Sequence, residues 1–483
     1  MPQILSEPSS TATLRPICVD LDGTLVKSDT LADSLLAMTR THPARLLGVP
    51  ASLLGGKAAL KAYVTDSISL DVVHLPYNHA VLRYLQDEHL NGRPIYLTTG
   101  ADTRLAERVA AHLGIFSGVL GSDGATNLTG KNKLESLLNR FGPGGFDYIG
   151  NATPDLPLLA HATEPMVANP SLALRLRLSA SGIVPKRRLD ERRSSFRVLV
   201  KALRIHQWSK NLLIAIPCLL AHGISVQRIL AVALAFASFS LTASATYMVN
   251  DLLDIEADRR HPRKRLRPFA AGDLSPASGL VMILLLLGLA FLGAHFLPRA
   301  FSGWLLLYLG STLAYSLYLK RIALVDVLVL SGLYTLRLQA GSAATATPIS
   351  HWLAGFAIFL FLSLAIVKRF AELENLRVSG LPPKNGRGYL VADTEQLRSF
   401  GTSSAFAAVV IFAIYISGHD VMTLYRNARL LWLIVPLMIL WLSRVWLLAS
   451  RGELNEDPVV FALTDRMSQF IGLAVVALAL LAL

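Results

Sequence analysis

Two carboxylates one residue apart, Asp20 and Asp22, lie at the end of the first apolar run of the chain. A carboxylate exposed at such a position can attack phosphorus, and a second carboxylate two residues later can protonate the leaving group. Acidic residues at the end of a strand are also common as turn formers and helix caps. The pair by itself therefore leaves a catalytic and a structural interpretation open.

Three further groups that suit phosphate chemistry follow later apolar runs, in chain order. They are the hydroxyl of Thr99, the ammonium of Lys133 and the carboxylate of Asp155. A hydroxyl can hold a phosphoryl oxygen, and a cation can neutralise both the phosphate and an attacking carboxylate. Mg²⁺ prefers a few carboxylates together with water and phosphate oxygens, which this set supplies. The combination favours a phosphate-transfer site.

These motifs resemble the four motifs of the haloacid dehalogenase (HAD) superfamily, over roughly residues 20–170. The resemblance implies that Asp20 is the nucleophile and Asp22 the acid and base. It implies that Thr99 and Lys133 bind the phosphoryl group, and that Asp20, Asp22 and Asp155 hold Mg²⁺. A domain of this type without activity is the alternative.

A second acidic cluster closes the second long apolar segment, and basic residues follow it at once. Its carboxylates are Asp251, Asp254 and Asp258, and their spacing predicts that they share one face of a helix. Charges beside lipid cost several kcal/mol unless they are paired or coordinate a ligand. Mg²⁺ on such carboxylates, next to Lys or Arg, would stabilise a departing diphosphate. An acidic helix end in the headgroup region is the structural alternative.

The pattern Asn-Asp-x-x-Asp-x-x-x-Asp at 250–258, followed by Lys-x-x-Arg-Pro at 264–268, resembles the first signature of the UbiA superfamily. The resemblance implies catalysis by Asp251 and Asp254, with Mg²⁺ bound by these two and by Asp258. The residues that it assigns to substrate binding are Asn250, Lys264 and Arg267.

A second signature of that superfamily is expected near the fifth and sixth apolar segments. Tyr315 and Lys320 fit its substrate-binding part, and Asp326 fits its first carboxylate. Where a second carboxylate would follow, the chain has Leu330. This departure weakens the expectation of two metal sites.

Three stretches, at 204–211, 336–341 and 368–373, resemble the branch of this superfamily represented by decaprenyl-phosphate phosphoribosyltransferase. The resemblance implies phosphoribosyl pyrophosphate as donor and a polyprenyl phosphate as acceptor. Extra cations would then bind the ribose phosphate and the lipid phosphate. The candidates are Lys201, Lys210, Arg337, Lys368 and Arg369. For each of them, a cation that anchors a loop at the membrane surface is the alternative.

The elements that must position the first site alternate between short apolar runs and amphipathic stretches, which predicts a Rossmann-like α/β domain with a mostly parallel sheet. The predicted strands are 16–20, 93–99, 118–122 and 146–150, and the predicted helices include 102–113 and 132–141. The segment 29–91 is helix-like and is expected to form a small cap. The predicted organisation is a flexible N-terminus over 1–15, a HAD-like phosphatase domain over 16–184 and a basic linker over 185–200.

The remaining residues, 201–483, are predicted to form an all-α membrane domain of the UbiA type. Of the 483 residues, 53% are hydrophobic and 16% charged, whereas soluble domains carry about 25% charged residues. A spanning helix needs about 20 apolar residues. Nine segments approach this length: roughly 210–223, 228–250, 277–296, 301–319, 323–345, 351–369, 400–418, 430–448 and 467–483.

The chain has a net charge of +13, and the distribution of its basic residues indicates a membrane topology. Basic residues concentrate on alternate loops between the apolar segments. The positive-inside rule therefore places those loops on the cytosolic side of a bacterial-type inner or plasma membrane. Residues 1–15 lack the apolar core of a signal peptide, so the N-terminal domain and both sites are expected on the same side. This distribution argues against a nucleic-acid partner, and a homo-oligomer stays open.

The predicted function joins the two sites. The membrane domain transfers phosphoribose from phosphoribosyl pyrophosphate to a polyprenyl phosphate and releases pyrophosphate, and the HAD-like domain removes the ribose 5-phosphate. One alternative keeps the fold and changes the donor, giving an aromatic prenyltransferase of the quinone type that uses a polyprenyl diphosphate. The other is a membrane-anchored phosphatase scaffold without transferase activity.

Overall fold

The structure, a computed structural model, describes residues 14–191, 195–221, 225–379, 387–454 and 458–483. The predicted flexible segment 1–15 lies almost wholly outside these residues, as do residues 192–194 of the predicted linker. The chain divides into two compact units. The first comprises Met1–Leu203 and Tyr247–Met282, and the second comprises Arg204–Thr246 and Ile283–Leu483.

The first unit contains a six-stranded parallel sheet in the order β3-β2-β1-β4-β5-β6. Its strands are β1 (Ile17–Val19), β2 (Ile95–Asp102), β3 (Gly118–Ser122), β4 (Asp147–Gly150), β5 (Pro165–Val167) and β6 (Arg187–Arg188). The parallel α/β domain and its four predicted strands are confirmed. The sequence analysis missed β5 and β6, which are three and two residues long.

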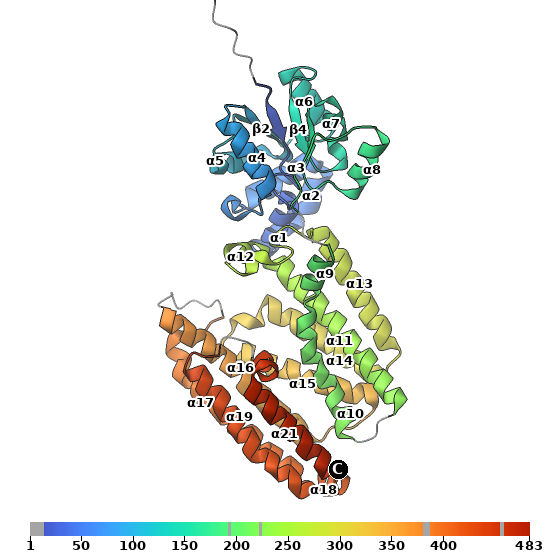
Figure 1. The fold of residues 1–483 in the computed structure, drawn as a ribbon, viewed down its shortest axis with the longest axis vertical. Helices are drawn as coiled ribbons and strands as arrows, with labels where there is room; N and C mark the ends of the chain where they lie inside the picture. The colour runs from blue at the N-terminus through green and yellow to red at the C-terminus, as the bar shows by residue number, and fades with distance from the viewer. Residues whose placement is uncertain (1–13, 192–194, 222–224, 380–386, 455–457) are drawn as a thin grey trace, which may run out of the picture. The chain divides into compact units, whose positions relative to one another are not determined.

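Two apolar cores cover the two faces of this sheet, as expected when successive side chains of a strand point to opposite faces. Ile17 and Val19 belong to one core, and Cys18 between them belongs to the other. Helices α4 (His79–Leu90) and α5 (Thr103–Leu113) supply the first core. Helices α6 (Lys131–Phe141), α7 (Leu156–His161) and α8 (Leu172–Ala180) supply the second, and the two groups flank the sheet in Figure 1.

Between β1 and α4 the chain forms a helical insertion, in agreement with the helix-like pattern of this segment. It contains α1 (Thr30–Thr41), α2 (Val49–Leu54) and α3 (Lys57–Ser67). Met38 from α1 packs on Leu60 and Val64 from α3, which gives the insertion a small core of its own. Asp29 caps α1 by accepting hydrogen bonds from two backbone N–H groups, each at 3.0 Å.

The predicted linker does not begin as a free connector. Its residues Arg187 and Arg188 form β6, which pairs with β5, and Leu189 packs against the core of the sheet. Helix α9 (Ser195–Leu203) follows, and the first unit also includes the stretch from Tyr247 to Met282. The proposed boundaries at 184 and 200 stay a prediction.

The second unit is all helical, and two long helices, α11 (Val226–Leu253) and α13 (Pro276–His295), contribute residues to both units. Within the described residues, six helices are long and apolar enough to cross a membrane. They are Val226–Leu253, Pro276–His295, Arg299–Leu317, His351–Arg377, Val391–Ile416 and Ala428–Ser450. The predicted count of nine spans is not confirmed.

Each of the three remaining segments departs from a regular spanning helix. The described part of the predicted segment 210–223, which ends at Ala221, contains the 3₁₀-helical stretch η4 (Ile205–Ala215) and the short helix α10 (Ile216–Leu220) with Pro217. Helix α15 (Val325–Thr345) has the length of a span but carries Asp326 and Arg337 among its buried residues. Helix α21 (Arg466–Ala482) is apolar, with 17 residues.

Helix α15 lies inside the second unit, in contact with α14 (Arg299–Leu317), α16 (His351–Ser379) and η4. Further helices pack in succession, from α16 to α17 (Thr394–Ile416), then α19 (Ile434–Ser450) and α21, as Figure 1 shows. The polar residues of α15 are therefore surrounded by protein, which explains how a helix with a lower overall hydropathy occupies this position.

Candidate active sites

The end of β1 opens on a cavity of about 440 Å³ in the first unit. Asp20 and Asp22 follow β1 directly, Lys133 comes from α6, and Asp155 lies in the helical turn after β4. The carboxyl ends of neighbouring parallel strands meet at one edge of a sheet, which is where open α/β folds place their ligands. Four of the residues predicted for the phosphatase site therefore line one cavity.

A buried lysine connects the carboxylates of this site. Lys133 Nζ donates a hydrogen bond to Asp20 Oδ1 at 2.8 Å and to the Tyr148 hydroxyl at 3.2 Å, and it lies 3.9 Å from Asp155 Oδ1. The Tyr148 hydroxyl donates to Asp155 Oδ1 at 2.9 Å, and two backbone N–H groups donate to Asp155 Oδ2. The ammonium group thus neutralises the carboxylate predicted to attack phosphorus.

Burial gives the two aspartates after β1 an unusual protonation behaviour. It raises the pKa of Asp20 to about 6, with the charge of Asp155 adding to the rise and Lys133 opposing it. Burial and the neighbouring Asp29 raise the pKa of Asp22 to about 7. Asp22 Oδ1 accepts a hydrogen bond from the Thr30 N–H at 2.8 Å, which fixes its orientation. A carboxyl group with a pKa near 7 suits general acid–base catalysis at neutral pH.

The lining of the cavity differs from the predicted set at two residues, because Thr99 is absent from it and Lys61, which the sequence analysis did not name, belongs to it. Thr99 is fully buried and is not among the residues that line the cavity, and its hydroxyl accepts a hydrogen bond from the Ala101 N–H at 3.0 Å. Lys61 of α3 lines the cavity, with its Nζ donating to Asn127 Oδ1 at 2.9 Å. The sequence analysis missed Lys61 because it stands within a helix that carries no phosphate-binding motif.

The donors at this site fit a magnesium ion chemically. Within the described ranges, no three His, Cys, Asp or Glu side chains form a group that could hold a metal ion. Mg²⁺ usually needs only one or two carboxylates, because water and substrate phosphate oxygens complete its coordination. Asp20 and Asp155 supply two carboxylates that line the cavity, with Asp22 beside them.

The second acidic cluster lies in the Tyr247–Met282 stretch of the first unit, around Arg267. Arg267 Nη1 donates to Asp251 Oδ1 at 3.1 Å and to Asp258 Oδ2 at 2.6 Å. Both carboxylates are buried, and burial raises the pKa of Asp258 although Arg267 opposes the rise. The structure therefore brings together two of the three predicted aspartates with the predicted arginine.

The third aspartate faces a different cation. Helix α11 ends at Leu253, α12 (Ile255–Arg260) begins two residues later, and Asp254 lies in the turn between them. The prediction of one uninterrupted helix is wrong at this turn, although the Asp254 N–H still donates to the Asn250 carbonyl at 3.0 Å. Asp254 Oδ1 instead accepts a hydrogen bond from Arg40 Nη1 of α1 at 2.8 Å.

Further ion pairs join α1 and its neighbourhood to α12, and the sequence analysis found none of them. Arg259 Nη2 lies 2.8 Å from Asp33 Oδ2, and both side chains are almost completely buried. Arg260 Nε donates to Asp71 Oδ2 at 2.8 Å on an exposed side of the helix. Such pairs join residues far apart in the chain, so no local pattern signals them.

Other predicted substrate ligands of this stretch lie at varied depths. Lys264 is exposed, and Asn250 is half-buried at the end of α11. Lys201 of α9 is exposed along its length, and its Nζ donates to the carbonyl oxygen of Leu266. Lys201 therefore holds the loop between α12 and α13 in this structure.

In the second unit, the predicted ligands Arg337 and Lys210 both lie close to the ring of Tyr334, and Arg337 also makes side-chain hydrogen bonds. Arg337 is buried on α15, where its Nε donates to Asn211 Oδ1 at 2.8 Å and its Nη2 to the Tyr308 hydroxyl at 3.1 Å. Its guanidinium carbon also lies 5.5 Å from the centre of the Tyr334 ring. Lys210 Nζ lies 5.9 Å from the same ring, within the range of a cation–π contact.

A buried polar network surrounds Asp326, the first carboxylate of the expected second signature. Arg369 Nε donates to Asp326 Oδ2 at 2.6 Å, and the Tyr389 hydroxyl donates to the other oxygen. Arg369 Nη2 reaches the Tyr315 hydroxyl at 3.3 Å. The remaining predicted ligands of this unit, Lys320 and Lys368, are half-buried.

Comparison with known proteins finds relatives of the whole chain and of part of it. The uncharacterized protein y4nM of Sinorhizobium fredii is 37% identical over 460 residues, covering 95% of this chain and 89% of that protein. The decaprenyl-phosphate phosphoribosyltransferase of Mycobacterium tuberculosis is 35% identical over 285 residues, covering 58% of this chain and 92% of that enzyme.

Two solved structures are similar to different parts of the chain at low sequence identity. A UbiA homolog from Archaeoglobus fulgidus, bound to GPP and Mg²⁺, is 18% identical with a TM-score of 0.46, covering 58% of this chain and 99% of that one. A HAD family hydrolase from Salmonella enterica is 14% identical with a TM-score of 0.26, covering 34% of this chain and 64% of that one.

The family comparison covers most of the helical part of the molecule. The sequence model of the UbiA prenyltransferase family matches residues 211–479, which is more than half of the chain and includes the acidic cluster around Arg267. The chain belongs to the UbiA prenyltransferase family.

Proposed function

We propose that the membrane part of this protein transfers a phosphoribosyl group from phosphoribosyl pyrophosphate to a polyprenyl phosphate. The observation that carries this proposal is the 35% identity to a decaprenyl-phosphate phosphoribosyltransferase over 285 residues. The match to the UbiA prenyltransferase family over residues 211–479 includes both the Asp251–Asp258 cluster and helix α15. We further propose that the HAD-like domain removes the ribose 5-phosphate from the product.

In the transfer step, a phosphate oxygen of the lipid attacks C1 of the ribose. The bond from C1 to the pyrophosphate oxygen breaks, and pyrophosphate leaves with the electron pair. Asp251, Asp254 and Asp258 would hold Mg²⁺, which would neutralise the departing diphosphate. Arg267 already lies between Asp251 and Asp258, so its guanidinium is positioned to pair with diphosphate oxygens when a substrate enters.

Cations elsewhere would hold the other phosphate groups of the two substrates. Lys264 and Asn250 belong to the same stretch as the acidic cluster, and Lys201 comes from α9. In the second unit, Lys210, Tyr315, Lys320, Arg337 and Lys368 are the proposed ligands of the ribose phosphate and of the lipid phosphate. A donor that needs no second acidic metal site suits this set of cations, because Asp326 is already paired with Arg369.

In the phosphatase step, Asp20 attacks phosphorus and the ribose oxygen leaves. Asp22 gives its proton to that oxygen, as its raised pKa allows. Water then attacks the aspartyl phosphate, Asp22 takes a proton from it, and inorganic phosphate is released. Lys133 neutralises the charge on Asp20 and the phosphoryl group. Asp20 and Asp155 would hold Mg²⁺, which would screen the phosphate oxygens and leave Asp22 as the acid and base.

The test uses the purified full chain in detergent with Mg²⁺, a polyprenyl phosphate and phosphoribosyl pyrophosphate labelled in the ribose. We expect label to enter the lipid phase, and the Asp251→Asn variant to reduce this transfer at least about a hundredfold. The exposed Glu395→Gln variant on α17 is the matched control and retains transfer.

Two other results would redirect the assignment. If the label stays in water while a polyprenyl diphosphate reacts with an aromatic acid, the protein is a quinone-type prenyltransferase. If neither donor reacts and the Asp251→Asn variant leaves cellular lipids unchanged, a membrane-anchored phosphatase scaffold is the better description. We propose the cytosol as the side of both sites, which accessibility labelling of the exposed Lys264 in sealed vesicles would test.

A further inference from the structure

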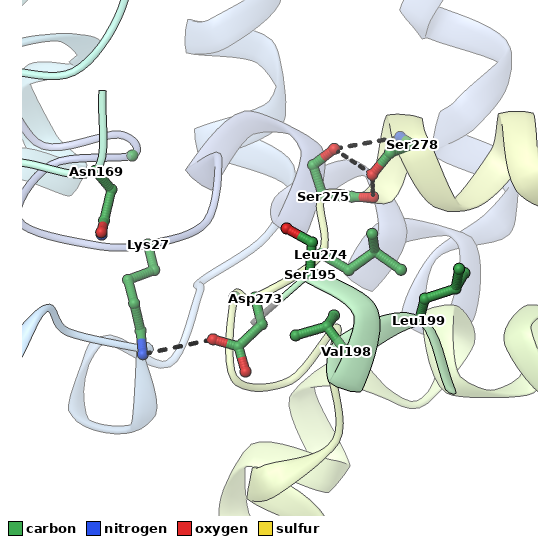
Figure 2. Close-up of a pocket in the computed structure, with 11 residues that line it drawn as sticks. Lys27, Asn169, Ser195, Val198, Leu199, Asp273, Leu274, Ser275 and Ser278 are labelled. Carbon is green, nitrogen blue, oxygen red and sulfur yellow. Dashed lines mark hydrogen bonds and ion pairs between the residues drawn. The ribbon is translucent and has the colours of Figure 1, made fainter. Parts of the chain in front are cut away.

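A second cavity, of about 470 Å³, adjoins the phosphatase cavity within the first unit. The two cavities share three lining residues, Gly23, Lys27 and Ser275. Figure 2 shows Lys27 reaching from one side of the second cavity toward Asp273 on the other. Any molecule whose phosphate enters the phosphatase cavity therefore has this space beside it for its remaining part.

One wall of the second cavity comes from segments that follow the parallel sheet in the chain. Helix α9 contributes Val198 and Leu199, the loop before α13 contributes Leu274, and the first turn of α13 contributes Ser278. This wall mixes aliphatic side chains with hydroxyl groups. A pocket of this composition suits an amphipathic ligand better than a free sugar phosphate, because aliphatic side chains gain by covering apolar groups.

The loop before α13 is packed closely on the segment that follows β1. Gly272 has a φ of +70°, and a Cβ at this position would lie 2.8 Å from the Lys27 Cβ. The Lys27 N–H donates to the Pro76 carbonyl at 2.9 Å, which holds its backbone in place. Only a glycine allows this approach, so the wall is part of the folded domain and not an incidental contact.

Lys27 supplies a positive charge at the boundary of the two cavities. Its Nζ lies 3.9 Å from Glu191 Oε1 and 4.0 Å from Asp273 Oδ1, beyond the 2.7–3.2 Å range of a hydrogen bond. The side chain is 14% exposed. An anionic ligand group that approached more closely would replace these long ion pairs with a charge-assisted hydrogen bond.

We propose that the second cavity is the specificity pocket of the phosphatase, and that it takes the phosphodiester and first apolar units of a lipid-linked sugar phosphate. Lys27 binds the phosphodiester while the terminal phosphate meets Asp20 and Lys133. This inference rests on the proposed phosphatase function and adds the residues that recognise the substrate beyond its terminal phosphate. The substrate carries two anionic groups, one to be hydrolysed and one to be held.

The test compares two phosphatase substrates on the purified full chain with Mg²⁺. One is para-nitrophenyl phosphate, which has a single anionic group, and the other is a short-chain prenyl-phospho-ribose 5-phosphate. We expect Lys27→Met to lower kcat/KM for the second substrate about tenfold to a hundredfold more than for the first, since a charge-assisted hydrogen bond is lost. Lys27→Arg, which keeps the charge, restores most of this selectivity.

A second variant probes the same pocket with the opposite sign. Asp273→Asn removes the carboxylate that faces Lys27 and would repel an anionic ligand, so we expect a lower KM for the prenyl-linked substrate. The exposed Lys57→Met on α3 is the control for loss of a lysine in the same domain, and its selectivity matches that of the wild type.

The outcomes separate this inference from the function on which it rests. If the wild type hydrolyses neither substrate in a manner that depends on Asp20, the phosphatase function itself is wrong. If the wild type hydrolyses both, and Lys27→Met lowers kcat/KM for both by the same factor, the specificity pocket is wrong and the phosphatase stands. Hydrolysis of para-nitrophenyl phosphate also reports whether each variant is folded.

Discussion

One cation bridges two carboxylates in each candidate site. Lys133 lies between Asp20 and Asp155, and Arg267 lies between Asp251 and Asp258. Carboxylates brought together in a buried place repel one another, and each bridge removes that repulsion while the site is without substrate. A phosphate substrate can then take over the same cation, so both sites hold their charge balance before and after binding.

The protonation of Asp22 predicts how the phosphatase responds to pH. Its pKa is raised from 3.8 to about 7, so it is protonated below that pH and loses its proton above it. We expect the single-turnover rate of aspartyl phosphate formation to be highest between the pKa values of Asp20 and Asp22. Above the pKa of Asp22 the rate should fall about tenfold per unit, because only the protonated form can act as the acid. Below the pKa of Asp20, about 6, the rate should fall as well, because a protonated carboxyl group cannot attack phosphorus. Rapid-quench measurement of released alcohol follows this step.

The matched variant for this measurement is Asp22→Asn. It removes the titrating acid, so we expect the fall at high pH to disappear and the fall below the pKa of Asp20 to stay, with a maximal rate about 10²–10⁴-fold lower than that of the wild type. A wild-type rate that stays constant from one unit below the pKa to two units above it would contradict the role assigned to Asp22.

At the scale of elements, α1 and α12 form the contact on which much of the first unit depends. Helix α1 carries Arg40 and Asp33, and α12 follows Asp254 and carries Arg259. The same short helix α1 begins with Thr30, whose N–H orients Asp22. A displacement of α1 would therefore disturb the phosphatase acid and the partner of Asp254 together.

The buried Arg259–Asp33 pair predicts a large local cost on truncation. Arg259→Met leaves a buried carboxylate without its cation, and we expect α1 and α12 to lose about 3–5 kcal/mol of local stability. Hydrogen–deuterium exchange of the two helices in the full chain measures this opening. The Arg260→Met variant removes an exposed pair and should cost less than about 1 kcal/mol. Equal exchange in both variants would contradict the ranking.

Close packing between η4 and α15 gives a second prediction at this scale. A Cβ at Gly341 would lie 2.1 Å from the Ile214 carbonyl oxygen, whereas one at Gly332 of the same helix would meet nothing within 4 Å. We expect Gly341→Ala to destabilise the second unit by about 1–3 kcal/mol. Gly332→Ala should be neutral or stabilise by up to about 1 kcal/mol, since alanine favours a helix. Thermal unfolding in detergent compares the two, and a Tm for Gly341→Ala at or above that of Gly332→Ala would refute the packing argument.

At the scale of the whole molecule, six apolar helices among the described residues and membership of the UbiA prenyltransferase family make this chain an integral membrane protein with a parallel α/β domain toward its N-terminal end. A relative from Sinorhizobium fredii matches 95% of the chain, so the similarity extends over both kinds of region. The two chemistries proposed for this chain are connected when the product of one site is the substrate of the other.

That order of reactions predicts the product of an inactive phosphatase. With phosphoribosyl pyrophosphate and polyprenyl phosphate as substrates, we expect Asp20→Asn to form a lipid that keeps the phosphate group at position 5 of the ribose. The wild type instead releases this phosphate group as inorganic phosphate. Mass spectrometry of the lipid extract distinguishes the two products by one phosphate group. Asp251→Asn should form neither. A dephosphorylated lipid from Asp20→Asn would show that the two reactions are not coupled in this chain.

Local patterns determined a large part of this protein. The four main strands, helices α5 and α6, and the positions of Asp20, Asp22, Lys133 and Asp155 follow from apolar runs and from motifs at strand ends. Such features depend on residues close in sequence, because a parallel sheet collects the ends of its strands at one edge whatever the rest of the chain does. The acidic cluster around Arg267 was also visible in the sequence, because its residues lie close together between positions 250 and 268.

Only the tertiary structure decided the contacts between distant residues and the role of each apolar segment. Lys27, Arg40, Lys61 and Arg259 belong to no local motif, and they reach their partners because the fold brings remote segments together. The sequence analysis counted α15 as one of nine predicted membrane spans. Its buried Asp326 and Arg337 instead make it an internal element of the second unit. A polar group is tolerated in such a helix when neighbouring helices supply its partners, and those partners come from other parts of the chain.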